Sequence, residues 1–240
     1  MLTTKFYSAS ITMAVLSALS GAAFAAGAGQ VQHLSGTLSV QRPDGSVRIL
    51  SQKSEVNPGD TLTTQRDSYA QINFTDGSSL TMRPNTQIKI EQFNFVQDRP
   101  QEDNSFLRLV KGGLRTVTGL VGKRGNQDAY KISTNTATIG IRGSSGDTID
   151  NSDGKCEGVT VDCEKLPAGV YHTTYTGSYI MQNEGGSRII GEGQFGFSGD
   201  FKTQPVILPG DPGLNAGQLP FTLGVSSGRL QGSGQECVVR

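Results

Sequence analysis

Apolar and polar residues alternate with a period of two along most of the chain after residue 31. Residues 70–74 read Ala-Gln-Ile-Asn-Phe, residues 80–83 read Leu-Thr-Met-Arg, and Asp76-Gly77 lies between them. Such alternation is typical of strands with one buried face, and Asp-Gly is a residue pair of tight hairpin turns. No window after residue 30 keeps apolar residues at the helical spacing i, i+3, i+4, i+7. The pattern therefore predicts an all-β protein built from short strands.

One stretch of this pattern occurs twice. Residues 36–49 and 177–190 both begin with glycine, continue as an alternating strand, turn at Gly-Ser and return through an apolar limb. Two matching hairpins near the ends of the domain are typical of stacked β architectures. Chance similarity between two glycine-rich hairpins is the alternative.

Three polar bands interrupt the strands and are expected as loops: residues 97–104, 122–128 and 146–167. The third is expected to be a loop insertion that projects from the core. After residue 209 the chain is rich in Gly, Ser and Pro, so we expect a tail at residues 215–240. These boundaries predict one domain over residues 31–214.

The first 25 residues have the three parts of a secretory signal peptide. Lys5 supplies the positive start, residues 11–16 open an apolar stretch, and Ala23-Phe24-Ala25 is a small-x-small cleavage site. A membrane anchor is the alternative, but about 20 apolar residues are needed to span a bilayer, and serines interrupt this run. We therefore expect cleavage after Ala25, no helical anchor elsewhere, and a periplasmic or secreted protein.

Charge and composition narrow the function classes. The 240 residues hold 21 Lys+Arg and 21 Asp+Glu, and removal of Lys5 with the signal leaves 20 − 21 = −1. This balance argues against nucleic-acid binding, which needs a basic face. The chain has 32 Gly, no Trp and only 2 His, so histidine-based catalysis has few options.

The three cysteines would meet an oxidising environment after export. Cys156 and Cys163 are spaced for a disulfide across a small loop, which leaves Cys237 odd. Cys237 is then free, pairs with another chain, or displaces one of the other two. Zinc is the weaker alternative, because the histidines are not paired at zinc-ligand spacing.

Catalytic motifs fail when their structural context is considered. Residues 191–196 match G-x-G-x-x-G, but no helical pattern follows to receive a phosphate. Residues 224–228 match G-x-S-x-G, but no histidine lies downstream. His33 and His172 are interpreted as edge-strand or surface residues. The sequence predicts neither an enzyme nor a cofactor.

An acidic cluster lies in the third band. Asp147, Asp150, Asp153 and Glu157, with Asn151, offer the oxygen ligands that calcium prefers, although the spacing does not fit an EF-hand. A solvated acidic loop pinned by the disulfide is the favoured interpretation. The loop would then complement a basic partner surface or Ca²⁺. Alternatively, the disulfide would only hold a surface loop closed, without a binding role.

Arg142 follows a strand-like run and precedes Gly143-Ser144. Its guanidinium would clamp loop carbonyls or meet an anionic ligand. The flanking glycines favour the structural role.

Several segments together resemble the FecR family of β-rich periplasmic domains. They include Pro58-Gly59-Asp60-Thr61-Leu62, the run 70–80 with Asp76-Gly77-Ser78, residues 111–115, and the run 138–144 that ends in Arg142-Gly143-Ser144. The resemblance extends over most of residues 31–214, and its second half is similar to stand-alone secreted members. It implies a stacked, solenoid-like, or alternatively sandwich-like, all-β domain with a binding role, and motif residues that are structural.

Two functional hypotheses follow. The first is a non-catalytic sensory or regulatory module that binds another envelope protein through strand edges and loops. The second is an envelope glycan-binding or structural protein that uses the outward residues Gln41, Gln71, Asn73 and Gln182. The absence of Trp argues against the second, since sugar sites commonly use exposed aromatic platforms.

Overall fold

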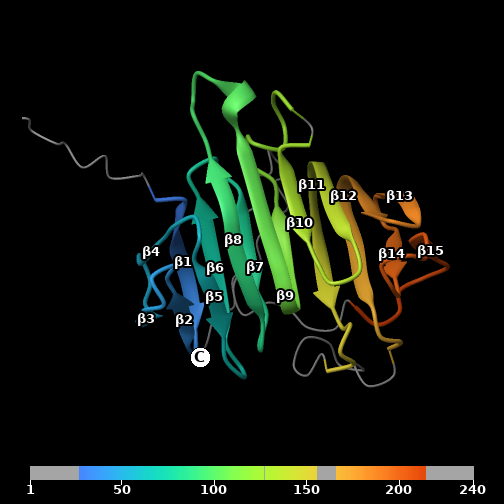
Figure 1. The fold of residues 1–240 in the computed structure, drawn as a ribbon, viewed down its shortest axis with the longest axis horizontal. Coiled ribbons are helices and arrows are strands. Elements are labelled where there is room, and N and C mark those ends of the chain that lie inside the picture. Colours follow the sequence, from blue (N-terminus) through green and yellow to red (C-terminus); the bar gives the residue numbers. More distant parts are fainter. Residues whose placement is uncertain (1–26, 127, 156–165, 215–240) are drawn as a thin grey trace, which may run out of the picture.

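The structure, a computed structural model, describes residues 27–126, 128–155 and 166–214. The expected signal peptide, the two close cysteines, the motif at 224–228, Cys237 and the expected tail lie outside these ranges. The described residues form fifteen strands in one continuous hydrogen-bonded sheet. Their only helical turn is η1 (Pro100–Glu102), and the all-β prediction is confirmed (Figure 1).

The sheet folds into two layers. The first, which we call the β8 layer, runs in the order β3 (Val47–Leu50), β2 (Leu38–Gln41), β5 (Thr61–Thr64), β8 (Gln87–Asn94), the start of β9 (Asn104–Val117), β10 (Tyr130–Ser133), the start of β11 (Thr138–Asp150), the end of β12 (Val170–Asn183) and β13 (Gly186–Gly191).

The second, the β7 layer, runs in the order β4 (Glu55–Val56), β1 (Gly29–Ser35), β6 (Tyr69–Phe74), β7 (Ser79–Met82), the end of β9, the end of β11, the start of β12, β14 (Phe195–Ser198) and β15 (Val206–Leu208). Strands β9, β11 and β12 are thus shared by both layers.

Each shared strand changes layer at a glycine with positive φ. Gly112 in β9 has φ 88°, Gly143 in β11 has φ 66°, and Gly177 in β12 has φ 72°. Glycine takes this conformation without the steric cost that a Cβ atom brings. The three glycines therefore let strands of 13 or 14 residues bend from one layer into the other.

The inward side chains of the two layers make one core. Leu38, Leu62 and Ile88 come from the β8 layer, while Ile72 and Leu80 come from the β7 layer, and all belong to one buried cluster. The alternation seen in the sequence therefore separates this core from the outer faces. The two packed layers fit the sandwich-like expectation, and the advance of the chain along the sheet fits the stacked one.

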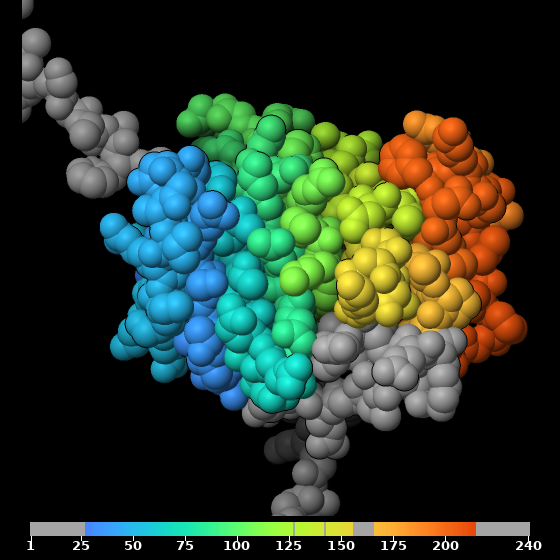
Figure 2. Space-filling model, turned by 60° about the horizontal axis from the view of Figure 1, so that its bottom comes forward, coloured from blue at the N-terminus to red at the C-terminus, as the bar shows by residue number. Residues whose placement is uncertain are grey.

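Residue number increases along the long axis of the molecule. The colours of Figure 2 pass from blue at one end to red at the other. The two similar hairpins, β2–β3 and β12–β13, lie near opposite ends, as the repeat predicted (Figure 1). No helix within the described ranges is long and apolar enough to cross a membrane.

Two loop boundaries differ from the prediction. Residues 146–150 belong to β11, so the connection to β12 starts only after Asp150. Its ends are joined by the backbone bonds Asn151 N–H to Gly169 O (2.9 Å) and Gly169 N–H to Asn151 O (3.2 Å). Asn104, expected in the first loop, begins β9. Glycine and serine in the run 143–146 resemble turn chemistry, although here they form a strand with an irregular register.

Candidate functional site

The motif residues Gly59 and Asp60 join β4 to β5. Gly59 has φ 88°, and the buried Asp60 carboxylate accepts bonds from Arg42 Nη1 (2.7 Å) and the Asn57 N–H (2.8 Å). The Gly59 N–H donates to the Ile90 carbonyl at 2.6 Å. These contacts are internal to the protein and pin the turn against β8.

Asp76, Gly77 and Ser78 form the turn between β6 and β7. The Asp76 carboxylate accepts bonds from the Ser78 N–H (2.9 Å) and hydroxyl (2.6 Å). Its other oxygen accepts the Val121 N–H at 3.2 Å. The turn therefore also holds the segment that follows β9.

Arg142 and Gly143 lie where β11 changes layer. Arg142 is opposite Ser178 of β12, and the register shifts between Arg142 and Ser145. The side chain of Arg142 is outside the described part of the chain, so its predicted role stays a prediction.

Asp147 is the centre of a buried charged cluster on the β7 layer. Its carboxylate, with no exposed surface, accepts bonds from Arg83 Nη2 (2.5 Å), Arg115 Nε (2.6 Å) and the Tyr175 hydroxyl (2.9 Å). Arg115 also lies over the Tyr175 ring, 4.7 Å from its centroid. Four strands, or the turns beside them, contribute to this cluster, which therefore fastens β7, β9, β11 and β12 together.

The arginines keep Asp147 ionised. Burial alone would raise the pKa of Asp147, but the hydrogen bond from Arg115 and the positive charges of Arg83 and Arg115 outweigh it, so the pKa lies below its usual value. This geometry corrects the expectation that Asp147 belongs to a solvated acidic loop.

The acidic cluster is dispersed by the fold. Asp150 is also buried, and its carboxylate accepts hydrogen bonds from the N–H and the hydroxyl of Ser152 at 3.0 and 2.6 Å. Asp153 accepts the Lys155 N–H at 2.9 Å. No group of three His, Cys, Asp or Glu side chains that could hold a metal ion occurs in the described residues. Glu157 and the predicted Cys156–Cys163 disulfide lie outside them, and the disulfide stays a prediction.

His172 is buried between the layers and is not the surface residue that the sequence suggested. Its Nδ1 is 3.0 Å from the Thr148 hydroxyl, and its ring lies 4.1 Å from the Tyr179 ring, centroid to centroid. Burial lowers the pKa of His172 to about 3, against a smaller opposing effect of Asp147. The histidine is therefore a neutral core residue at physiological pH.

This burial predicts a pH-dependent stability. Because the folded pKa is lower than the unfolded value, the unfolded state binds a proton first as the pH falls below about 6.5. We expect His172 to make the free energy of unfolding decrease by about 1.4 kcal/mol per pH unit below this value, with the loss ending near the folded pKa of about 3.

Urea unfolding between pH 6.5 and 5 measures this slope, above the range in which most carboxylates titrate. His172→Gln should be less stable at pH 7 but have a shallower slope, whereas His33→Gln is the matched control. An unchanged slope in His172→Gln would contradict the burial of a neutral histidine.

The outer face of the β8 layer carries a basic strip that the sequence analysis missed. Lys89 lies directly opposite Arg108, and Phe106 lies beside Lys131. Lys111 is opposite Gln87 on the same face. Like charges opposite each other in a sheet are destabilising, and no ion pair involves these four cations in the described part of the chain.

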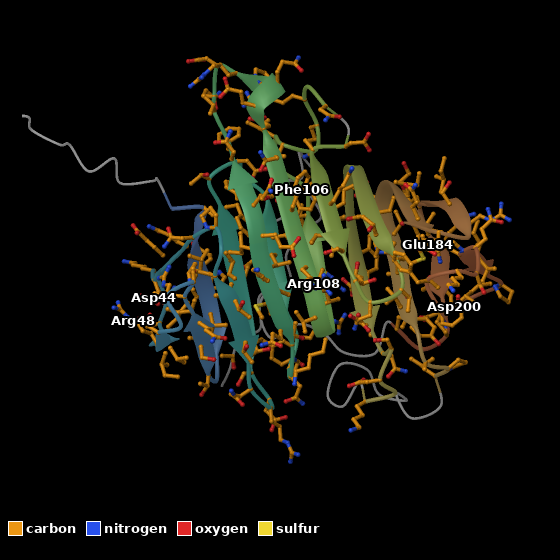
Figure 3. All side chains as sticks on the ribbon, in the orientation of Figure 1. Asp44, Arg48, Phe106, Arg108, Glu184 and Asp200 are labelled. Atoms are coloured by element: carbon orange, nitrogen blue, oxygen red, sulfur yellow. The ribbon has the colours of Figure 1, made fainter. Side chains whose placement is uncertain are left out.

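Figure 3 shows Phe106 and Arg108 near the middle of the molecule, between Asp44 and Arg48 at one end and Glu184 and Asp200 at the other. Outward polar positions of β8 and β9 were visible in the sequence. The pairing of these residues across the two strands could not be predicted, because the connection from Asn94 to Asn104 does not define the register.

A groove of about 460 Å³ continues the basic strip across β10, β11 and β12. Its lining includes the strand residues Lys131, Thr138, Gly140, Ile180 and Gln182. Asp128, Asn183, Glu184 and Phe201 complete it. The predicted outward residues Gln41 and Gln182 are exposed on this layer, and Asn73 is exposed on the other. Gln71 is on the same face of β6 as Asn73 but is only 5% exposed, so its side chain is covered.

The molecule also has open strand edges. Strand β3 pairs only with β2 among the described strands, and its Val47 and Ile49 side chains are 65% and 68% exposed. At the other end, Ile189 of β13 and Val206 and Ile207 of β15 are also exposed. Open apolar edges of this kind can accept another strand.

The fold and these surfaces define a two-layer all-β protein with open faces and edges. The FecR protein family model matches residues 60–165. The FecR resemblance predicted from the sequence is therefore confirmed over this region.

Solved structures give weaker similarity. Two crystal structures of a proposed anti-sigma factor from Parabacteroides distasonis are each 10% identical, with a TM-score of 0.46, and cover 63% of this chain and 60% of that chain. The chain thus spans about three fifths of their length. A cell surface anchoring domain is 24% identical, with a TM-score of 0.26, over 26% of this chain and 83% of its own. No curated protein has significant sequence similarity to the chain.

Proposed function

We propose that this chain is a non-catalytic FecR-family module of the cell envelope that binds a protein partner and has a sensory or regulatory role. The match of residues 60–165 to the FecR protein family model supports this class of function. Binding requires an accessible surface, and the open edge of β3 is the observation on which the proposal rests. His172, the histidine that a catalytic alternative would need, is buried against Thr148 and Tyr179.

The edge of β3 suits the addition of a partner strand. The Arg42 N–H donates to the Ser46 carbonyl at 2.9 Å, which fixes the alternation of hydrogen bonds along the β2–β3 hairpin. By that alternation, the peptide groups of Val47 and Ile49 point away from β2. Their exposed side chains add apolar area that an incoming strand would cover.

Proline at position 49 tests this mode of binding. Ile49→Pro removes an outward N–H and leaves the bonds to β2 intact, since edge strands tolerate proline where the N–H faces outward. We expect at least about tenfold weaker partner binding than with Ile49→Ala, which keeps the N–H, because a hydrogen bond is lost and the ring obstructs the incoming strand.

The partner itself is identified by site-specific photo-crosslinking in intact cells. A photoreactive residue replaces Val47, and the control variant carries it at the exposed Asn73 of β6. The captured protein is then purified, and its affinity for the two Ile49 variants is measured. Adducts at both positions alike, or equal affinities for Ile49→Pro and Ile49→Ala, would rule out strand addition at β3.

We also propose export to the periplasm through the signal peptide at residues 1–25. The charged start, the apolar stretch and the Ala23-Phe24-Ala25 site support this location. Mass spectrometry of the N-terminus, on protein from the periplasmic fraction, should give a chain that starts at Ala26. Full-length protein in the cytoplasmic fraction would contradict it.

A further inference from the structure

The outer face of the β8 layer has a combination of groups that neither the edge of β3 nor the family resemblance explains. Basic side chains lie on β8, β9 and β10, while hydroxyl and amide side chains continue the same face on β11 and β12. One row of directly opposed residues crosses the layer: Gln41, Thr61, Lys89, Arg108, Ser133, Thr138 and Gln182.

We propose that this face binds a linear acidic polysaccharide, whose carboxylates meet the basic strip and whose hydroxyls enter the groove. Neighbouring strands are about 4.8 Å apart, so the row presents a polar group at intervals comparable to the length of a sugar unit. A polymer that lies across the strands can therefore use several positions of the row at once.

The charge distribution favours an anionic ligand at the centre of the face. Lys89 and Arg108 are directly opposed across β8 and β9, an arrangement that repels unless an anion lies between them. Lys131 lies one strand further on, beside the half-buried Phe106. Phe106 offers the sugar ring an apolar surface, which the absence of Trp did not lead us to expect. Glu91 is the one exposed acid on the described part of β8.

The groove favours a sugar over an acidic peptide. Asp128 and Glu184 lie in its wall together with Gln182 and Asn183. Carboxylates and amides accept hydrogen bonds from sugar hydroxyls, and the side chains of an acidic peptide such as poly-glutamate carry no hydroxyls to donate. The basic strip and the groove together thus distinguish the two classes of polymer.

Binding of alginate, a linear polysaccharide with a carboxylate on each sugar, tests the proposal in the purified protein. Poly-glutamate and neutral dextran are the comparison ligands. We expect calorimetry at low salt to show alginate binding that weakens as salt is raised, and weaker binding of both other polymers. No alginate binding, or tighter binding of poly-glutamate, would overturn the polysaccharide assignment.

Matched variants locate the site. Lys89→Gln/Arg108→Gln should weaken alginate binding about three- to thirtyfold, the range for two exposed charge contacts. Lys53→Gln/Arg66→Gln removes the same charge from exposed positions elsewhere and should leave the affinity within about twofold. Equal losses in both variants would show non-specific attraction and contradict this site.

The groove is tested separately by Gln182→Ala. This variant should weaken alginate binding and leave any residual binding of poly-glutamate unchanged. Both substituted regions are exposed, and removal of the repulsion between Lys89 and Arg108 should not unfold the protein, which thermal melting will verify. Unchanged alginate affinity in Gln182→Ala would place the polymer outside the groove and contradict the proposal.

Discussion

Replacing Asp147 by asparagine is expected to lower the free energy of unfolding by about 3–5 kcal/mol, the cost of breaking a buried ion pair from one side. The substitution removes the negative charge between Arg83 and Arg115. The Arg83 side chain is only 3% exposed, so water cannot replace the lost partner. Two arginines would then repel each other at the junction of four strands.

Urea unfolding at pH 7 measures this loss. Glu192→Gln, which removes an exposed carboxylate in the turn before β14, is the control and should be close to neutral. A loss below about 1 kcal/mol for Asp147→Asn would indicate that the arginines are hydrated and that the cluster is not the buried junction described above.

The same substitution should change the response to acid. The pKa of Asp147 is lower in the folded than in the unfolded state, so its contribution is present above the unfolded value of about 3.9 and is lost as the pH falls through the folded value. Asp147→Asn should therefore lack the part of the acid destabilisation that lies below about pH 4. The contribution of Asp147 is thus lost at lower pH than that at which the contribution of His172 begins to decrease. The two groups can therefore be separated by the pH at which stability falls.

The sequence predicted those parts of the fold that depend on local pattern. The Asp76-Gly77 hairpin is present as β6–β7, with Asn73 opposite Ser79. The two similar hairpins at residues 36–49 and 177–190 are also present. In these cases turn residues and alternation lie within one short window, so neighbouring residues suffice to define the structure.

The Asp147 cluster could not be predicted in this way. Arg83 and Arg115 lie 64 and 32 residues before Asp147 in the sequence, and no local pattern brings them together. The small residues from Gly143 to Gly146 resemble turn chemistry, and the predicted loop begins at Gly146. Tertiary pairing with β9 and β12 makes this run a strand, which turns an apparently solvated acid into a buried one.

The basic strip and the groove failed to emerge from the sequence for a related reason. The overall charge is balanced, and composition says nothing about which side chains share a face. Lys89, Arg108 and Lys131 become neighbours only when β8, β9 and β10 pair in the observed register. A neutral protein can therefore carry a charged surface that only the fold defines.

The second large effect concerns the glycine at which β9 changes layer. Gly112→Ala is expected to lower the free energy of unfolding by about 2–5 kcal/mol, as the sum of a left-handed backbone conformation and a steric clash. The φ of Gly112 is 88°, and a Cβ atom there would lie 2.6 Å from the Thr86 Cα and 3.0 Å from the Asn85 carbonyl oxygen.

The neighbouring contacts make this clash hard to relieve. The Thr86 hydroxyl donates to the Gly113 carbonyl at 3.0 Å, and its oxygen accepts the Gly113 N–H at 2.9 Å. If Thr86 moves away from a new Cβ, both bonds are strained. The turn between β7 and β8 and the bend in β9 are thus locked to each other, and an alanine at position 112 must disturb both layers.

Gly77→Ala separates the two contributions. Gly77 has φ 81°, close to that of Gly112, but no atom lies within 4 Å of its Cβ position. The free energy of unfolding of Gly77→Ala should therefore decrease only by the conformational cost, about 1–2 kcal/mol. Gly112→Ala should be at least about 1 kcal/mol less stable than Gly77→Ala. Equal losses in urea unfolding would mean that the bend in β9 can relax, and that the crossing of β9 between the layers is set by hydrogen bonding rather than by the contact with Thr86.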